Sequence, residues 1–206
     1  MLVIDGGANV CLAASMLQDS YPDLLVSNCA CHILNTITKY ILTDKLDEFV
    51  DDLEEDFALE NEDEEFKELL NHILCQQFTS TFEKCRLVCR HFSHSVKSSE
   101  LLKEKLKKHC IKGYTKLIQP NTTRWNSNFF CLKRILDCKE ALEHTFICIK
   151  RKVSLDDEDF NKISLMLKLL QPFQTSSVQL QEDELTYGNI VPSIVTIYCS
   201  LEVNSI

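Results

Sequence analysis

The pattern of apolar and polar positions predicts a short strand–helix–strand unit at the start of the chain. Residues 2–4 are a short apolar run that ends at two glycines, and residues 8–17, rich in Ala and Leu, predict a helix. A second apolar run at 24–27 follows a Tyr-Pro-Asp turn. Two short buried strands joined by one helix are typical of a βαβ unit with parallel strands.

From residue 30 onward the apolar residues recur every three or four positions, which predicts helices and no strand. The expected helices cover residues 31–43, 64–75, 82–96, 126–150, 156–180 with a bend near Pro172, and 190–203. Only four Gly and four Pro occur in 206 residues, which also favours long helices. No stretch approaches the roughly 20 apolar residues that a membrane span needs.

The apolar positions of two of these helices predict the side that faces the core. In helix 31–43 the apolar stripe consists of Ile33, Leu34, Ile37 and Ile41. In helix 82–96 the stripe consists of Phe82, Cys85, Val88, Cys89, Phe92 and Val96. Arg86, Arg90 and Lys97 fall on the opposite side of the second helix, which predicts a basic outer face.

Charge is divided unevenly along the chain. Residues 44–68 contain 14 acidic residues and two lysines, a net charge of −12, and residues 84–134 contain 13 basic residues and two glutamates, a net charge of +11. A dense block of like charge repels itself, so residues 44–65 predict an acidic flexible linker. The basic block has the composition of a surface that faces phosphates, or both blocks are only solvated helix faces.

Eleven cysteines without a repeating spacing favour a reducing compartment in which most thiols pack as small apolar groups. Cys29 and His32 form a Cys-x-x-His pair, which can begin a zinc site, but such a site needs four ligands. The best second pair, Cys85 and Cys89 with two histidines nearby, lies on the apolar face of a helix. The pattern therefore favours packing over zinc.

Two further positions are candidates for chemistry. Asp5 follows the first strand, where open α/β sheets place their functional groups, although a lone Asp there is more often a turn residue. Arg124 and Trp125, the only Trp, stand in the basic block directly before a helix. Trp125 is either a core anchor or, with Arg124, a clamp that holds a phosphate and stacks on an exposed base.

Five segments, taken in order, resemble the hAT superfamily of transposases. Residues 3–9 resemble the "T-D-N-x-A-N" segment of that family, and residues 29–35 resemble "C-x-x-H-x-L-N". Residues 85–95 are similar to the "R-x-x-V-x-x-F-x-x-S" helix, residues 123–127 to "T-R-W-N-S", and residues 169–175 to "L-x-P-F-x-x-x-T". Each segment alone is a weak match, and the resemblance is specific because all five occur in the family's order. Within the superfamily, the chain is most similar to transposon-derived proteins that carry BED-type zinc fingers.

The resemblance implies an RNase H-like catalytic domain interrupted by an all-helical insertion. In the family, three carboxylates hold two divalent metals, Mg²⁺ or Mn²⁺, for DNA cleavage and strand transfer. Asp5 matches the second carboxylate, and His32, with its motif partner Cys29, matches the histidine beside the active site. Arg124 and Trp125 match the pair that holds a base flipped out of the duplex.

The fold expected from the sequence is therefore α/β and mainly helical. It divides into a partial RNase H-like core with one short βαβ unit over residues 1–43, the acidic linker over 44–65, and an all-helical insertion domain over 66–206. The family places its first carboxylate upstream of Asp5 and its glutamate beyond the helical insertion. Because one carboxylate cannot position two metals, the sequence predicts that this chain is not catalytic by itself and holds no cofactor.

The function expected is that of a transposase-derived, DNA-associated nuclear protein. Arg86 and Arg90 would contribute to an electrostatic DNA surface, and no membrane association is expected. The family's N-terminal zinc finger and its C-terminal dimerisation region, which would support a homo-oligomer, are not matched here. Two alternatives remain. The sequence is a truncated reading of an active transposase, or the protein is a host-recruited protein-interaction module or transcription regulator that binds no DNA.

Overall fold

The start of the chain forms the predicted strand–helix–strand unit. Strands β1 (Leu2–Ile4) and β2 (Val26–Asn28) pair in parallel, with Ile4 opposite Asn28, and helix α1 (Ala8–Ser20) connects them. The parallel pairing is confirmed, although β2 begins two residues later than the apolar run at 24–27 suggested. Backbone hydrogen bonds outside the strands extend the pairing at both ends, from Leu2 N–H to Leu25 O and from Cys29 N–H to Ile4 O, each 2.7 Å long.

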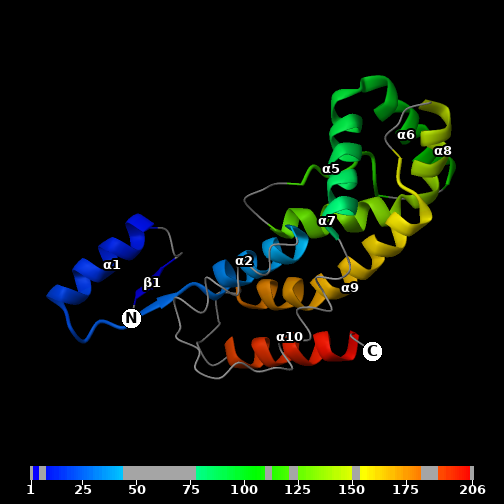
Figure 1. Cartoon of the computed structure of the whole chain (residues 1–206). Helices are drawn as coiled ribbons and strands as arrows, with labels where there is room; N and C mark the ends of the chain where they lie inside the picture. The colour runs from blue at the N-terminus through cyan, green and yellow to red at the C-terminus, as the bar shows by residue number, and fades with distance from the viewer. Residues whose placement is uncertain are drawn as a thin grey trace.

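The remaining elements are helices, named as in Figure 1. The computed structural model describes residues 2–4, 8–43, 78–109, 113–120, 125–149, 154–181 and 190–204. Beyond β2, these residues contain α2 (Ala30–Thr43), α5 (Phe78–His94), α6 (Val96–Lys108), α7 (Trp125–Asp137), α8 (Lys139–Ile149), α9 (Asp157–Gln179) and α10 (Ile190–Asn204). The acidic linker predicted over 44–65 and the helix predicted over 64–75 lie outside the described residues.

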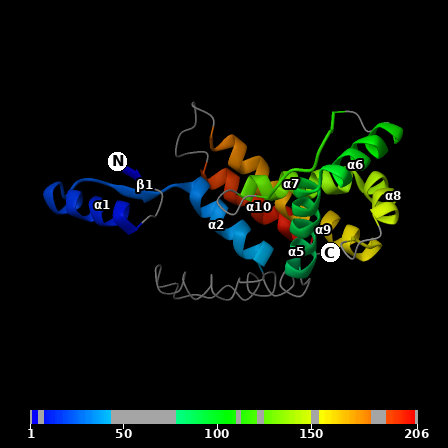
Figure 2. The same ribbon diagram turned by 90° about the horizontal axis from the view of Figure 1, so that it is seen from above.

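Helix α9 is the central element of the helical body. It contacts α2, α5, α7 and α10, while α8 packs against α6 at the end far from the sheet. Figure 2 shows the same order from above, with α1 and β1 at one end and α6 and α8 at the other. The described part of the chain is therefore mainly helical with one small parallel sheet.

One continuous hydrophobic core runs through this helical body. Its largest fully buried side chains are Leu42, Phe78, Val88, Leu102, Leu106, Leu132, Ile135, Leu142, Ile163, Met166 and Leu170. Helix α2 also supplies Leu34 and Ile41 to this core, so α2 packs with the helices that follow it. Three of the four residues assigned to this stripe agree with the expectation, since Leu34 and Ile41 are buried and Ile37 packs against the core. Ile33 is exposed, and Thr38 is buried instead, its hydroxyl donating to Leu34 O at 2.8 Å.

Two helix boundaries differ from the expectation. Val96, assigned to the apolar stripe of a helix over 82–96, is 74% exposed, because α5 ends at His94 and Val96 begins α6. The Ser95 side chain caps α6 by accepting from the Ser98 N–H. The single helix expected over 126–150 is two helices, α7 and α8, separated at Cys138.

A buried carboxylate joins the start of α9 to α5. Asp159 accepts hydrogen bonds from the Lys84 ammonium at 2.8 and 2.9 Å and from the Thr81 hydroxyl at 3.0 Å, and it forms a capping box with Asp156. Burial alone would raise the pKa of Asp159, but the hydrogen bonds from Lys84, from the Asp156 N–H and from Thr81 outweigh it and hold that pKa below its usual value. Asp159 is therefore a charged tie between two helices.

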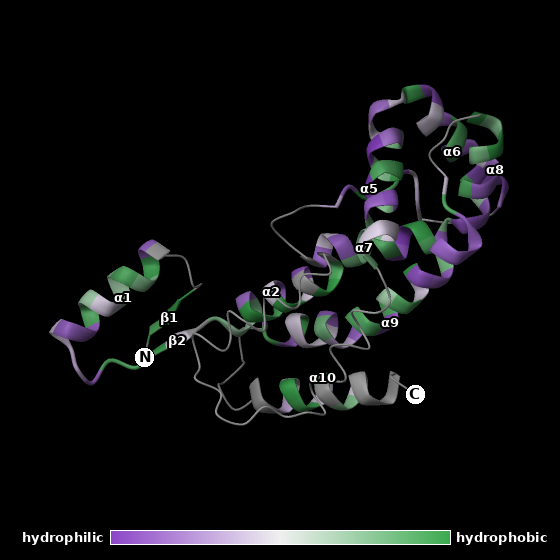
Figure 3. Cartoon of the chain, viewed as in Figure 1, coloured by the Kyte–Doolittle hydropathy of each residue, from purple (hydrophilic) through white to green (hydrophobic). Residues whose placement is uncertain are grey.

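The strand–helix–strand unit has little core of its own. Ile4 and Ala14 are buried, whereas Leu12 and Met16 on α1 are 64% and 63% exposed. Figure 3 shows hydrophobic residues along α1, and in Figures 1 and 2 none of the other described helices lies beside it. Among the described residues, no helix combines the length and apolar character that crossing a membrane requires.

Candidate nucleic-acid interface

The two arginines predicted on the outer face of α5 are exposed, as the helical spacing indicated. Arg86 donates to the Glu83 carboxylate one turn earlier, with 2.6 Å between Nη1 and Oε1. Arg90 makes no ion pair with any described acidic residue. Of the two, Arg90 is therefore the cation whose charge remains available to a ligand, while part of the charge of Arg86 is offset.

Helix α6 presents a basic face to solvent. Its inner side is fixed by Ser98, Leu102 and Leu106, which are buried. Its exposed cations, which we call the α6 lysines, are Lys97, Lys103, Lys107 and Lys108. None of the α6 lysines forms an ion pair with an acidic residue in the described part of the chain. Four exposed lysines on one helix of 13 residues therefore remain without an acidic partner among the described residues.

A histidine pair holds the end of α6 against α8. His109, the C-cap of α6, has its Nε2 2.7 Å from His144 Nδ1 and its Nδ1 3.1 Å from a Glu140 carboxylate oxygen. The two imidazole rings are stacked, with 4.7 Å between their centroids. Because α8 lies behind α6, this contact fixes the orientation of the helix that carries the α6 lysines.

The loop after α6 positions another cation. Gly113 begins the described part of this loop with a φ of +86°, a backbone conformation that favours glycine. The Arg134 guanidinium of α7 lies 3.6 Å over the Tyr114 ring and donates to Lys116 O at 2.9 Å. The Tyr114 hydroxyl donates to Asp137 at 2.7 Å, and this hydrogen bond raises the pKa of Tyr114.

Sequence reasoning missed this stacking of Arg134 on Tyr114, because a cation–π contact between a loop and a distant helix leaves no spacing pattern.

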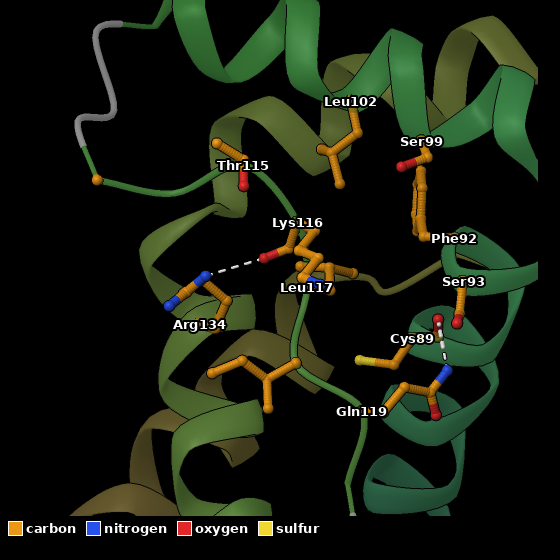
Figure 4. Close-up of a pocket in the computed structure, with 12 residues that line it drawn as sticks. Cys89, Phe92, Ser93, Ser99, Leu102, Thr115, Lys116, Leu117, Gln119 and Arg134 are labelled. Atoms are coloured by element: carbon orange, nitrogen blue, oxygen red, sulfur yellow. Dashed lines mark hydrogen bonds between the residues drawn. The ribbon is translucent and has the colours of Figure 1, made fainter.

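The loop after α6 also lines a cavity of about 590 Å³ together with α5, α6 and α7 (Figure 4). Its lining includes Cys89, Phe92, Lys116 and Arg134. The Gln119 side chain donates to Cys89 O at 3.2 Å and fixes the loop to α5. The cavity therefore combines two cationic residues with an apolar wall.

Where the strand–helix–strand unit joins α2, Cys29 and His32 lie beside the carboxyl ends of the paired strands. Cys29 follows β2 and is tied to Ile4 through its N–H, while His32 is exposed on the first turn of α2, its N–H bonded to Cys29 O at 2.9 Å. Their assignment to a catalytic site stays a prediction from the family resemblance. Asp5, the candidate carboxylate, lies outside the described residues.

The Arg-Trp pair is only partly described. Trp125 is the first residue of α7, but its side chain lies outside the description, as does all of Arg124. Their assignment to base stacking or to the core remains a prediction from the sequence. What the structure adds is the position of the Trp125 backbone at the start of α7, a helix that packs against α9.

The described residues contain no group of three or more His, Cys, Asp or Glu side chains that could hold a metal ion. Cys85 and Cys89, the weaker zinc candidates, are buried in the core. Burial raises the pKa of the Cys85 thiol above its ordinary value, which disfavours the thiolate that a metal needs. These two residues pack as apolar groups, in line with the interpretation that the sequence favoured.

Comparison with known proteins gives the class of the helical body. The sequence model of the ZBED1 RNase-like helical domain matches residues 27–169, from β2 to α9 and well over half of the chain. The chain therefore carries an RNase-like helical domain. It belongs to the BED-type family of proteins derived from hAT transposases, which confirms the resemblance carried by its sequence motifs.

The curated relatives agree with this family. Human zinc finger BED domain-containing protein 6 is 26% identical over 117 residues, which is 57% of this chain and 12% of the relative, and its mouse counterpart gives the same figures. Human zinc finger BED domain-containing protein 4 is 20% identical over 109 residues, 53% of this chain and 9% of the relative. The chain thus spans a small part of the relatives' length. No solved structure matches it significantly.

Proposed function

We propose that this chain is a DNA-associated part of a transposase-derived nuclear protein, and that α5, α6 and the loop after α6 contact the DNA backbone. The α6 lysines carry the proposal, because they are exposed and make no ion pair with a described acidic residue. Two other lysines of the body are compensated: Lys84 pairs with Asp159 and Lys139 with Asp157. Family membership supports the same assignment.

Phosphate contacts of this kind have a recognisable physical signature. Lysines neutralise phosphates and release condensed counterions, so affinity falls steeply as the salt concentration rises. Lysine is a point charge without the planar fork of arginine, so it does not select one base over another. Binding through the α6 lysines should therefore be weak, largely independent of sequence, and sensitive to salt.

We propose further that this chain does not cut or join DNA by itself. The proposal rests on the family resemblance, which gives this chain a match for the second metal-binding carboxylate, Asp5, and for neither of the other two. Two-metal chemistry needs carboxylates on both ions, because one ion activates the attacking oxygen and the other stabilises the leaving oxygen. Incubation with duplex DNA and Mg²⁺ or Mn²⁺ should leave the DNA intact. Cleavage that disappears in Asp5→Ala would instead identify an active transposase.

The experiment for DNA binding compares two variants of the whole chain. Replacing Lys103, Lys107 and Lys108 together by Gln should weaken duplex binding and reduce the slope of log K against log salt by up to about three, near 0.9 for each lost phosphate contact. The matched control is Lys168→Gln, which removes an exposed lysine from α9, away from α6. Its slope should equal that of the wild type.

The alternative outcomes separate the remaining functions. If the triple variant and the wild type bind duplex DNA with equal affinity and slope, the α6 lysines are not the contact surface and the proposal is wrong. If the wild type shows no salt-dependent binding to any duplex, the chain is better explained as a protein-interaction module. Circular dichroism of each variant separates a loss of contacts from a loss of the fold.

A further inference from the structure

Two buried thiols face each other between α5 and α7. The sulfur atoms of Cys89 and Cys131 are 3.4 Å apart, and their side chains are 2% and 0% exposed. The sulfurs of a disulfide are about 2.05 Å apart, so the two sulfur atoms have to approach each other by only about 1.4 Å. The two residues come from different helices, which means that a bond between them would cross-link the core.

One of the two thiols can be reached by a small molecule despite its burial. Cys89 lines the cavity of about 590 Å³ shown in Figure 4, where its sulfur points toward the space beside Leu117. A water molecule occupies only about 30 Å³ in the liquid, so a small oxidant fits in this space. Cys131 does not line the cavity. An oxidant that enters therefore meets Cys89 first.

The buried surroundings raise the thiol pKa of the cysteines that lie next to Cys89. The hydrogen bond shared with Cys89, together with burial, raises the pKa of the Cys131 thiol. Cys131 therefore loses its proton less readily than an ordinary thiol, and the thiolate is the reactive form of cysteine. Cys85 stands one turn before Cys89 on α5, and burial raises the pKa of its thiol as well. Access from the cavity therefore favours Cys89 as the sulfur that attacks the oxidant.

We propose that Cys89 and Cys131 are an oxidation site, at which a small peroxide converts the two thiols into a disulfide between α5 and α7. The Cys89 thiolate attacks one peroxide oxygen, the O–O bond breaks, and the products are a sulfenic acid and hydroxide. The Cys131 sulfur then attacks the sulfenic sulfur and displaces the second hydroxide. Two thiols lose two electrons and two protons, and one molecule of hydrogen peroxide becomes two molecules of water.

The disulfide would act on the part of the body that carries the basic residues. Arg86 and Arg90 lie on the same helix as Cys89, and α7, which holds Cys131, begins at Trp125. Cross-linking these helices restricts their relative movement and lowers the entropy of the unfolded chain, so the oxidised form should melt at a higher temperature. The oxidation site is independent of the proposed DNA binding, and it stands whether or not the chain binds DNA.

Peptide mapping of the whole chain tests the proposal. The reduced protein is treated with hydrogen peroxide under native conditions, the remaining thiols are alkylated in denaturant, and the digest is analysed by mass spectrometry. Trypsin cuts after Lys84, Arg86 and Arg90, which places Cys85 and Cys89 on different peptides. The expected product is one cross-linked species that joins the Cys89 peptide to the Cys131 peptide and disappears on reduction with dithiothreitol.

Variants identify the attacking sulfur and control for general oxidation. Cys131→Ala should leave a sulfenic acid on Cys89 that dimedone traps, and Cys85→Ala, a buried change on the same helix, should still form the cross-link. The proposal is overturned if the wild-type thiols of Cys89 and Cys131 remain alkylatable at peroxide levels that oxidise the exposed Cys148. A cross-link from Cys89 to Cys85 in place of Cys131 would overturn it as well. Both the alkylation and the cross-link are measured on the wild-type protein.

Discussion

The strand–helix–strand unit and the helical body are built from the same kinds of residues but are stabilised to very different degrees. The unit, residues 2–28, buries Ile4 and Ala14 and leaves Leu12, Met16 and Leu25 largely exposed. The body buries a continuous cluster from α2 to α10. A lone pair of strands is marginal in water unless a hydrophobic face is covered. The difference shows that most of the stability of the described chain comes from the helices.

Charge follows the same division. Residues 2–28 contain no Lys, Arg or His, whereas α5, α6, α7 and the loop after α6 hold most of the basic residues. The residues that resemble catalytic ones, Cys29 and His32, stand at the junction between the unit and the body. The comparison therefore separates a region with catalytic-type motifs and few packing contacts from a region with packing and positive charge.

A core truncation tests the difference in packing directly. Leu132 of α7 is fully buried, and Leu132→Ala should lower the free energy of unfolding by about 2–5 kcal/mol, because the shortened side chain leaves a cavity. The matched change in the unit, Leu12→Ala, should alter it by no more than about 0.5 kcal/mol, since Leu12 is already exposed. Urea unfolding monitored by circular dichroism measures both. Equal losses would mean that α1 is covered in solution.

The next prediction concerns the contact of Asp159 at the start of α9 with Lys84 and Thr81 of α5. Asp159→Asn removes the charge that Lys84 and Thr81 approach and weakens the cap of α9, and it should cost about 1–3 kcal/mol. Lys84 is 44% exposed, so its own charge can return to water and adds little to this cost. Lys84→Met, which keeps the length of the side chain, should therefore cost less than Asp159→Asn in the same unfolding experiment.

The same residue predicts a dependence on pH. The pKa of Asp159 is lower in the folded protein than in the unfolded chain, so its contribution is complete above the unfolded value of about 3.9. That contribution is lost as the pH falls through the lower folded pKa, because the carboxyl is then protonated in both the folded and the unfolded state. Asp159→Asn should flatten the stability curve in this acidic window and leave its shape near neutral pH unchanged.

The sequence predicted local features of the fold well and missed those that depend on packing between distant helices. The parallel strands and the buried stripe from Phe82 to Phe92 were found because each has a periodicity within a few residues. The separation of α7 from α8 at Cys138 was missed, since no Gly or Pro marks it and the change of direction lets α7 pack on α9 and α8 on α6. The start of α6 had a local signal, the capping serine Ser95, which outweighs the apolar spacing of Val96.

The candidate site divides in the same way. Arg86 and Arg90 are exposed as predicted, because helical spacing fixes the direction of a side chain. The functional roles assigned to them, and to Cys29 and His32, stay predictions. The stacking of Arg134 on Tyr114 and the contact of Cys89 with Cys131 join separate elements. Such contacts are a property of the packed structure, and no spacing in the sequence encodes them.

Trp125, at the start of α7, decides whether the body only attracts DNA or also recognises an unpaired base. If its ring stacks on an extruded base, Trp125→Ala should weaken binding to DNA with unpaired bases by about 1–3 kcal/mol and leave duplex binding and the melting temperature nearly unchanged. If the ring is a core anchor, the same change should cost about 3–5 kcal/mol of stability. Equal losses on both DNA substrates together with a large fall in melting temperature would exclude stacking.

Single charges on α6 should have the smallest effect and give the sharpest contrast between the two regions. Lys107→Gln removes one of several exposed cations and should reduce the salt slope of duplex binding by about one at most, with little change in affinity at a fixed salt concentration. The control lies in the strand–helix–strand unit, where Asp19→Asn changes the net charge by the same amount with the opposite sign on the exposed surface of α1. If binding responded only to the net charge of the chain, Asp19→Asn would strengthen it as much as Lys107→Gln weakens it. A local contact surface on α6 predicts instead that the slope for Asp19→Asn equals that of the wild type, because the slope counts phosphate contacts and α1 makes none.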